Sequence, residues 1–284
     1  MVALPIFGAL ASAGGTILER SVLKIKKIDT KLYQTASFLA IVIVMIPFLY
    51  FIWNIKPEAA SLKNLIIFGL VIIFSVVANL FTYYSMKWEK VSNLEPAKLL
   101  QPLFVILLAI IFSFFVDHGL YERNLKVIIP AIIAGLAIIF SHLKKYHFDF
   151  NKYFVAAIFG SFFFALELVI SRLILDYYSA ITFYFLRSLS IFLVSLILFR
   201  PDFSKLDKKS SKVIALTSIV WVVYRVTIYY GYTHLGIIST TLMIMLEPIF
   251  LYFLAWKFLK EKPTKRNIVA AGIILACVLY GTLA

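Results

Sequence analysis

The chain has 284 residues, of which 62% are hydrophobic and 15% charged, and its mean hydropathy is +0.96. This composition excludes a soluble globular domain and places the chain in a lipid bilayer. The net charge of +14 does not indicate a nucleic-acid partner, because the basic residues lie in short segments between apolar runs, where anionic lipid headgroups attract them.

Ten apolar runs of about 20 residues follow one another along the chain, and each is long enough to cross the hydrocarbon core as a helix. The runs do not alternate polar and apolar residues, so they do not predict the strands of a membrane β-barrel. The fold class we expect is an all-α polytopic membrane protein with ten transmembrane helices. They are predicted over residues 4–23, 32–54, 64–86, 93–116, 124–143, 153–174, 178–199, 212–234, 236–258 and 267–283.

The two halves of the chain resemble each other at polar and proline positions, which match by chance less often than Leu or Ile. Shifts of 146 to 148 positions align Tyr83-Tyr84 with Tyr229-Tyr230, Pro102 with Pro248, and Glu19 with Glu167. We interpret this as an internal duplication, with one repeat at residues 1–146 and the other at 147–284. Because five crossings deliver the chain to the opposite face, the two five-helix repeats should be inverted, an arrangement typical of secondary transporters that work by alternating access.

The motifs of the third and fourth predicted helices of each half resemble a known family. The third helix is rich in Tyr, and the fourth carries Gln101-Pro102-Leu103-Phe104 in one half and Glu247-Pro248-Ile249-Phe250 in the other. The chain is similar to the EamA-like branch of the drug/metabolite transporter superfamily. The stretch Phe258 to Glu261 is similar to the family's Leu-Gly-Glu element, which the first half lacks. This resemblance implies a ten-helix transporter fold and favours export, but it does not supply a substrate.

Two carboxylates lie at corresponding places in the first helix of each half. A charge at the bilayer centre costs at least about 2.5–3.5 kcal/mol on insertion scales, so it usually faces protein or water. Inversion should put Glu19 and Glu167 on different sides of the midplane, where a desolvated carboxylate could take up a proton or a cationic group. We therefore predict that they couple transport to protons. The alternative is that each forms a structural ion pair with a basic residue such as Arg187 or Arg225.

Two arginines inside predicted helices are candidates for anion binding, because Arg stays charged in proteins. Arg225 shares a helix face with aromatic residues, corresponds to Asn79 in the first half, and has Arg187 on the preceding helix as a second candidate. The arginines could instead pair with a membrane Glu, and the tyrosines could lie at the membrane interface rather than in a substrate site. The candidate substrate-binding residues are Arg225, Arg187, Glu247, Asn79, Tyr83, Trp221, Tyr229 and Tyr232.

The paired prolines Pro102 and Pro248 predict interruptions in two membrane helices, because proline removes a backbone hydrogen bond. A matching break in each repeat favours a role in gating. The alternative is a static kink that lets two helices pack closely.

Basic residues are distributed unevenly between the two sides of the predicted membrane. Segments after odd-numbered helices hold 19 Lys and Arg residues and those after even-numbered helices hold 4. The positive-inside rule then predicts that both termini lie outside. The family resemblance implies cytoplasmic termini, so the two indications conflict.

The sequence contains neither a His-Glu-x-x-His nor a Gly-x-Ser-x-Gly run, and no Gly-rich phosphate loop. We therefore expect no enzymatic activity, no metal and no cofactor. The function we expect is secondary transport of a small polar metabolite, such as an amino acid, across the inner or plasma membrane. We expect a monomer or homodimer whose partners are its solute and membrane lipids, without a nucleic acid. Two alternatives stay open, which are an exchanger of phosphorylated or nucleotide-linked sugars that uses Arg187 and Arg225, and a membrane-embedded lipid-handling enzyme or subunit.

Overall fold

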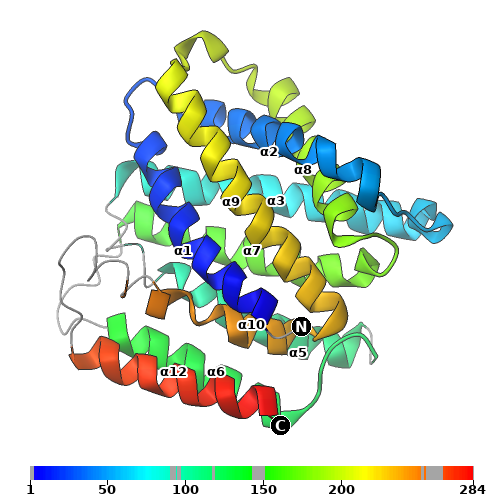
Figure 1. Ribbon diagram of the computed structural model, residues 1–284, viewed down its shortest axis with the longest axis vertical. Helices are drawn as coiled ribbons and strands as arrows, with labels where there is room; N and C mark the ends of the chain where they lie inside the picture. The colour runs from blue at the N-terminus through cyan, green and yellow to red at the C-terminus, as the bar shows by residue number, and fades with distance from the viewer. Residues whose placement is uncertain are drawn as a thin grey trace.

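The computed structural model describes residues 3–89, 94, 97–116, 119–142, 151–250, 253 and 265–283. In this part of the chain, ten α-helices pack into one bundle (Figure 1). They are α1 (Ala3–Leu23), α2 (Thr30–Ile52), α3 (Leu62–Trp88), α5 (Leu100–Phe115), α6 (Leu125–His142), α7 (Lys152–Leu175), α8 (Ala180–Phe199), α9 (Lys208–His234), α10 (Ile237–Ile244) and α12 (Lys265–Leu283), with two short 3-10 helices, η1 (Pro57–Ala60) and η2 (Phe203–Lys205). The predicted all-α fold is confirmed.

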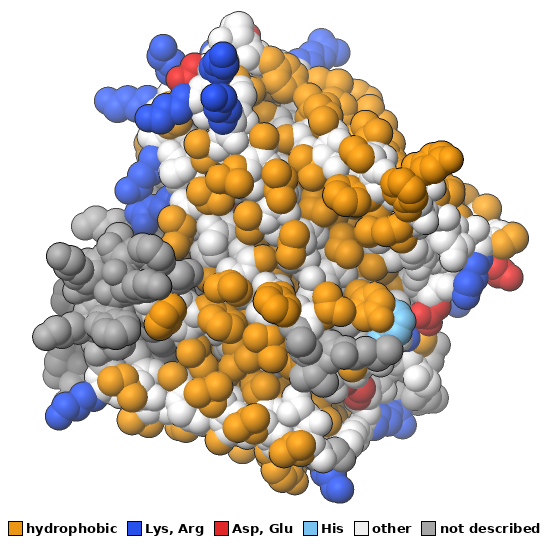
Figure 2. Space-filling view, viewed as in Figure 1, with side chains coloured by type: hydrophobic (Ala, Val, Ile, Leu, Met, Phe, Trp, Pro, Cys, Tyr) orange, Lys and Arg blue, Asp and Glu red, His pale blue; other side chains and the backbone are white. Residues whose placement is uncertain are grey.

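Six of these helices are long and apolar enough to cross a membrane by length and composition, namely α2, α3, α7, α8, α9 and α12. Helices α5 and α6 and residues 237–250 form shorter apolar helices. Helix α1 is more polar, because Ser12, Thr16 and Glu19 lie along it. In Figure 2, hydrophobic side chains cover most of the visible face, and Lys and Arg side chains gather at its edges. The protein is therefore a multi-pass membrane protein.

Polar residues between the apolar runs begin the helices sharply. The carboxylates of Asp29 and Asp207 accept the backbone N–H groups of Leu32 and Ser210, at 2.7 and 2.8 Å, and so cap α2 and α9. At the start of α8, the Ser179 side chain caps its own helix, and its hydroxyl also donates to a carbonyl at the end of α2. The chain thus reverses within a few residues at these points.

The contacts between helices are the same when each helix is replaced by its counterpart in the other half. Helix α1 packs against α9, and the counterpart pair, α7 and α3, also packs together. Helix α2 packs on its own counterpart α8, and α6 packs on its own counterpart α12. The end of α2 bonds to the start of α8, while Gln34 near the start of α2 donates to Ser195 near the end of α8 over 3.0 Å, so these helices are antiparallel. Helices α6 and α12 are also antiparallel (Figure 1). A two-fold axis that relates antiparallel helices is perpendicular to them, which supports the interpretation of inverted repeats.

The closest helix contacts need small residues. A Cβ atom at Gly160 of α7 would lie 2.5 Å from Thr82 Oγ1 on α3, and one at Gly15 of α1 would lie 3.3 Å from Val220 on α9. Small residues let membrane helices approach each other closely. These contacts bring the polar positions of α1, α3, α7 and α9 together in the middle of the bundle.

Both prolines of the repeated motif follow a break in a helix. Helix α10 ends at Ile244, Met245 and Leu246 form a turn, and residues 247–250 are helical again. In the first half a turn at Leu99 precedes α5. A proline ring clashes with the carbonyl four residues earlier, which belongs to Ile244 for Pro248 and to Lys98 for Pro102. The paired interruptions predicted from the two prolines are therefore present in the described parts of residues 93–116 and 236–258.

Candidate functional site

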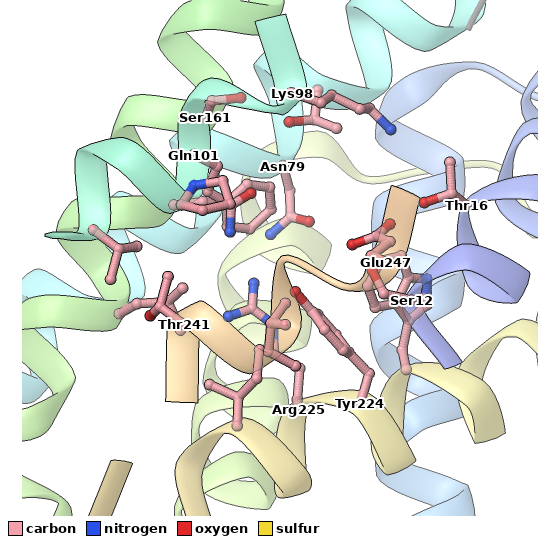
Figure 3. A pocket seen from close by; sticks show the side chains of 18 of the residues that line it. Ser12, Thr16, Asn79, Lys98, Gln101, Ser161, Tyr224, Arg225, Thr241 and Glu247 are labelled. Atoms are coloured by element: carbon pink, nitrogen blue, oxygen red, sulfur yellow. The ribbon is translucent and has the colours of Figure 1, made fainter. Parts of the chain in front are cut away.

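A cavity of about 160 Å³ lies in the middle of the bundle. Its described lining residues come from α1, α2, α3 and α5 to α10, so both halves of the chain contribute to it (Figure 3). The volume has room for on the order of ten water molecules, or for one small organic solute.

The two helix breaks face this cavity. Pro102 and Pro248 both line it, as do the residues that precede them, Gln101 and Glu247. Because each broken helix is the counterpart of the other, the cavity is built around equivalent elements of the two halves. Irregular backbone at membrane depth is tolerated where it lines such a cavity.

One wall of the cavity holds two arginines that share a single carboxylate. Arg187 Nε lies 2.9 Å from Glu167 Oε1 and donates to Ser75 Oγ at 3.0 Å, while Arg225 Nη1 lies 3.1 Å from Glu167 Oε2. The Tyr229 hydroxyl donates to Glu167 Oε1 at 2.7 Å. We call Glu167, Arg187 and Arg225 the guanidinium cluster; its formal charges sum to +1.

The guanidinium cluster is withdrawn from solvent. The Glu167 side chain is 0% exposed, that of Arg187 1% and that of Arg225 8%. The Arg225 guanidinium also lies over the Phe164 ring, with 5.1 Å between Cζ and the ring centroid. Buried charges are stable when they are paired and hydrogen-bonded, and removal of one partner from such a pair costs about 3–5 kcal/mol.

The members of the guanidinium cluster differ in what they face. Arg187 and Arg225 line the cavity, whereas Glu167 and Tyr229 are not among its lining residues. Glu167 therefore lies behind the two arginines, in the ion-paired arrangement that the sequence left open as its alternative. Tyr229, a predicted substrate-binding residue, donates a hydrogen bond to this carboxylate.

Glu19 has a different environment from its counterpart Glu167. It lines the cavity together with Trp221, and it is only 3% exposed. Lys98 lines the same cavity and lies close enough to act electrostatically on the Glu19 carboxylate. Glu19 lies about one helical turn before the end of α1, and Glu167 about two turns before the end of α7. The interpretation of inverted repeats therefore places them toward opposite faces.

The tyrosine pairs of the third helices divide between cavity and outer contacts. Tyr83 lines the cavity, and its ring lies edge-on to Tyr33 with 5.0 Å between centroids. Its neighbour Tyr84 packs on Tyr153, and in the second half Tyr230 stacks on the His234 ring. Successive residues of a helix point about 100° apart, so one member of each pair faces inward.

The remaining predicted residues also reach the cavity. Asn79, Trp221 and Tyr232 line it, and the Tyr232 and Thr241 hydroxyls are 3.4 Å apart. In Figure 3, Glu247 lies beside Ser12 and Thr16 on one side, and Gln101 and Thr241 lie on the other.

Several polar lining residues were missed from the sequence, among them Lys98, Ser12 and Thr16. Lys98 lies four residues before Pro102 inside a predicted helix, where a lysine is rare enough to be a signal. Ser12 and Thr16 precede Glu19 by seven and three residues and so share a face of α1 with it, and this polar stripe was also visible in the sequence. The stretch Phe258 to Glu261 lies outside the described residues.

A bundle of ten helices with a polar cavity between equivalent broken helices is the architecture of a membrane transporter. Residues 151–281 match the family model described as the EamA-like transporter family, so this part of the chain is an EamA-like transporter domain. The domain supports a membrane transporter of the drug/metabolite type. A solved structure titled only "Crystal structure of protein" shares the fold, with a TM-score of 0.71, 13% sequence identity, and coverage of 99% of this chain and 98% of that one. The search of curated proteins gave no match.

Proposed function

We propose that the protein is a secondary active transporter that carries a small polar organic metabolite, such as an amino acid, through the central cavity by alternating access. The observation that carries this proposal is that Pro102 and Pro248 interrupt equivalent helices of the two halves and both line the cavity. Inverted repeats with broken helices around one central site are the arrangement in which rocking of one repeat against the other exposes that site to each face in turn.

The lining supports a polar solute. It combines the acidic groups of Glu19 and Glu247 with the basic groups of Lys98, Arg187 and Arg225. An apolar solute would displace water from these charged groups without offering hydrogen bonds in its place, which costs free energy. Export is the direction that the family resemblance favours.

We further propose that Glu19 is the group that couples transport to protons. Glu19 faces the cavity, while Glu167 is held between two guanidinium groups and the Tyr229 hydroxyl. A carboxylate that exchanges a proton must be reached by water in at least one state, and Glu19 meets this condition better.

A thermal-shift screen of the purified protein against a metabolite panel identifies the solute, because a ligand that binds the folded state raises the melting temperature. Uptake of that solute into proteoliposomes then tests the proposal. We expect uptake that is driven by a pH gradient, is lost in Glu19→Gln and is retained in Glu58→Gln, whose carboxylate lies in the exposed η1 segment. Uptake that ignores the pH gradient, or that is unchanged in Glu19→Gln, contradicts proton coupling.

The exchange of phosphorylated or nucleotide-linked sugars is a second candidate, favoured by two guanidinium groups at one cavity wall. An exchanger of this kind needs solute on the opposite side and no pH gradient. Counterflow measured in the same proteoliposomes, with and without a pH gradient, separates the two candidates.

A further inference from the structure

The charge of the guanidinium cluster is set by one residue. Glu167 offers two carboxylate oxygens, and both are occupied, Oε1 by Arg187 Nε and the Tyr229 hydroxyl and Oε2 by Arg225 Nη1. With Glu167 ionised between them, two guanidinium groups present a net charge of +1 to the cavity rather than +2.

The two arginines do not share this charge equally. Arg187 is 1% exposed, and its Nε contacts both Glu167 and the Ser75 hydroxyl. Arg225 is more exposed, and its contact with Glu167 is the longer of the two, through Nη1. A guanidinium group has five N–H donors, so Arg225 can hold Glu167 and a ligand at the same time. The remaining positive charge is therefore available mainly at Arg225.

The rest of the cavity limits how much negative charge a ligand can bring. Among the described lining residues, Glu19 and Glu247 are acidic, and Lys98 is the one cation besides the two arginines. Together with Glu167, which lies behind the arginines, these described groups comprise three positive and three negative charges. A phosphate monoester has a charge of about −1.5 to −2 at neutral pH and would place excess negative charge beside buried carboxylates.

We propose that Arg225 binds a single carboxylate of the transported solute, and that Glu167 is a built-in counterion which fixes the site at one positive charge and so excludes phosphate dianions. Arg187 is a positioning residue that orients Glu167. This inference rests on the proposed transport function and narrows its substrate to compounds with a monoanionic carboxylate. Charge-assisted bonds are short and bidentate contacts are possible between Arg and a carboxylate, so the contact gives orientation as well as affinity.

Three probes of equal carbon skeleton test the proposal by thermal shift of the purified protein: glycerate, glycerol 3-phosphate and glycerol. In the parent protein glycerate should raise the melting temperature more than the other two. Arg225→Gln should abolish the advantage of glycerate over glycerol, which corresponds to an affinity lower by about tenfold or more.

Substitution of the counterion should change the preferred charge. In Glu167→Gln the cluster carries +2, and glycerol 3-phosphate should then stabilise the protein more than glycerate. The double variant Glu167→Gln/Arg187→Gln has a net charge of +1 again and should restore the preference for glycerate. If Glu167→Gln does not fold, the Arg225→Gln comparison and the double variant still test the charge rule.

The proposal is overturned if glycerol 3-phosphate stabilises the parent protein at least as well as glycerate, if glycerate is no better than glycerol, or if the double variant prefers the phosphate. Its failure is distinguishable from failure of the transport function. A protein that transports a neutral or cationic solute independently of Arg225 contradicts only the inference, whereas a protein that moves no solute contradicts the proposed function itself.

Discussion

The Tyr229 hydroxyl donates a hydrogen bond to Glu167 Oε1 over 2.7 Å, behind the cavity wall. It thereby completes the set of donors around a carboxylate that already faces two guanidinium groups. The residue that corresponds to it in the first half, Tyr83, lines the cavity instead. The two halves are thus alike in helix arrangement and different in the chemistry of equivalent side chains.

Tyr229→Phe should lower the free energy of unfolding by about 1.5–3 kcal/mol, because it removes a donor from a buried, ionised carboxylate. Tyr230→Phe is the matched control, since the Tyr230 ring stacks on His234 at the outer side of the same helix. Thermal or denaturant unfolding in detergent measures both variants. Equal stability of the two would show that the Tyr229 bond contributes nothing.

Arg187→Gln should lower the free energy of unfolding by about 3–5 kcal/mol, because it leaves one of two buried charge contacts of Glu167 unmade. Lys205→Gln removes a positive charge from the exposed η2 segment and should change stability by less than about 0.5 kcal/mol. A loss in Arg187→Gln no larger than in Lys205→Gln contradicts the buried ion pair.

Pro248→Ala and Pro102→Ala should slow transport more than they weaken solute binding. Alanine can restore the helix at each break, which stiffens the element that we assign to gating. Pro47 offers a control, because it also lies inside a helix, α2, but its side chain is exposed at the outer surface. The transport rate in proteoliposomes and the ligand-induced thermal shift separate the two effects. Gating by the breaks is contradicted if Pro47→Ala slows transport as much.

Glu122 connects the segment before α6 to the beginning of α10. Its carboxylate accepts the N–H groups of Ile238 and Ser239, the latter at 2.9 Å, and the Ser239 hydroxyl at 2.6 Å. A carboxylate at a helix N-terminus is stabilised by the helix dipole and by free N–H groups. Glu122→Ala should therefore cost about 1–2 kcal/mol of stability.

Gly236 precedes α10 with φ +91°, and a Cβ atom there would lie 2.2 Å from the Glu122 carboxyl carbon. Gly236→Ala should accordingly be more destabilising than Glu122→Ala, since it adds both backbone strain and a clash. A comparison of the two melting temperatures with that of the parent protein checks this order, and Glu58→Gln serves as a carboxylate control. A melting temperature of Gly236→Ala equal to that of the parent protein contradicts the predicted strain and clash at this position.

Helix number and approximate bounds could be predicted because the bilayer sets the length of each apolar run and because polar residues such as Asp29 and Asp207 mark helix starts. The paired breaks at Pro102 and Pro248 followed from a local steric rule. What could not be predicted is which partner a buried charge takes. Glu19 and Glu167 look equivalent in sequence, and only the tertiary fold, which brings Arg187 of α8 and Arg225 of α9 to α7, decides that Glu167 meets two arginines.

Which tyrosine of each adjacent pair faces the cavity depends on the rotation of the helix about its axis. The sequence does not fix this rotation closely enough to choose between two successive residues. The polar residues along α1, and separately Lys98, could be seen in the sequence. They indicated a cavity only weakly, because Ser, Thr and Lys also occur near membrane interfaces. The resemblance to a family gave the architecture. It gave no information on the guanidinium cluster, which depends on individual residues of this chain.

The central claim is that one cavity between the halves is exposed to each face of the membrane in turn. Cys277 is the only cysteine of the chain, so one substitution gives a cysteine-free background. Single cysteines at Ser12 and Thr241, one from each half of the cavity lining, would then be treated with a membrane-impermeant thiol reagent in right-side-out and inside-out vesicles. We predict reaction from both sides at both positions and no reaction at the outward-facing Phe159→Cys. Reaction from one side only, or from neither, would contradict alternating access through this cavity.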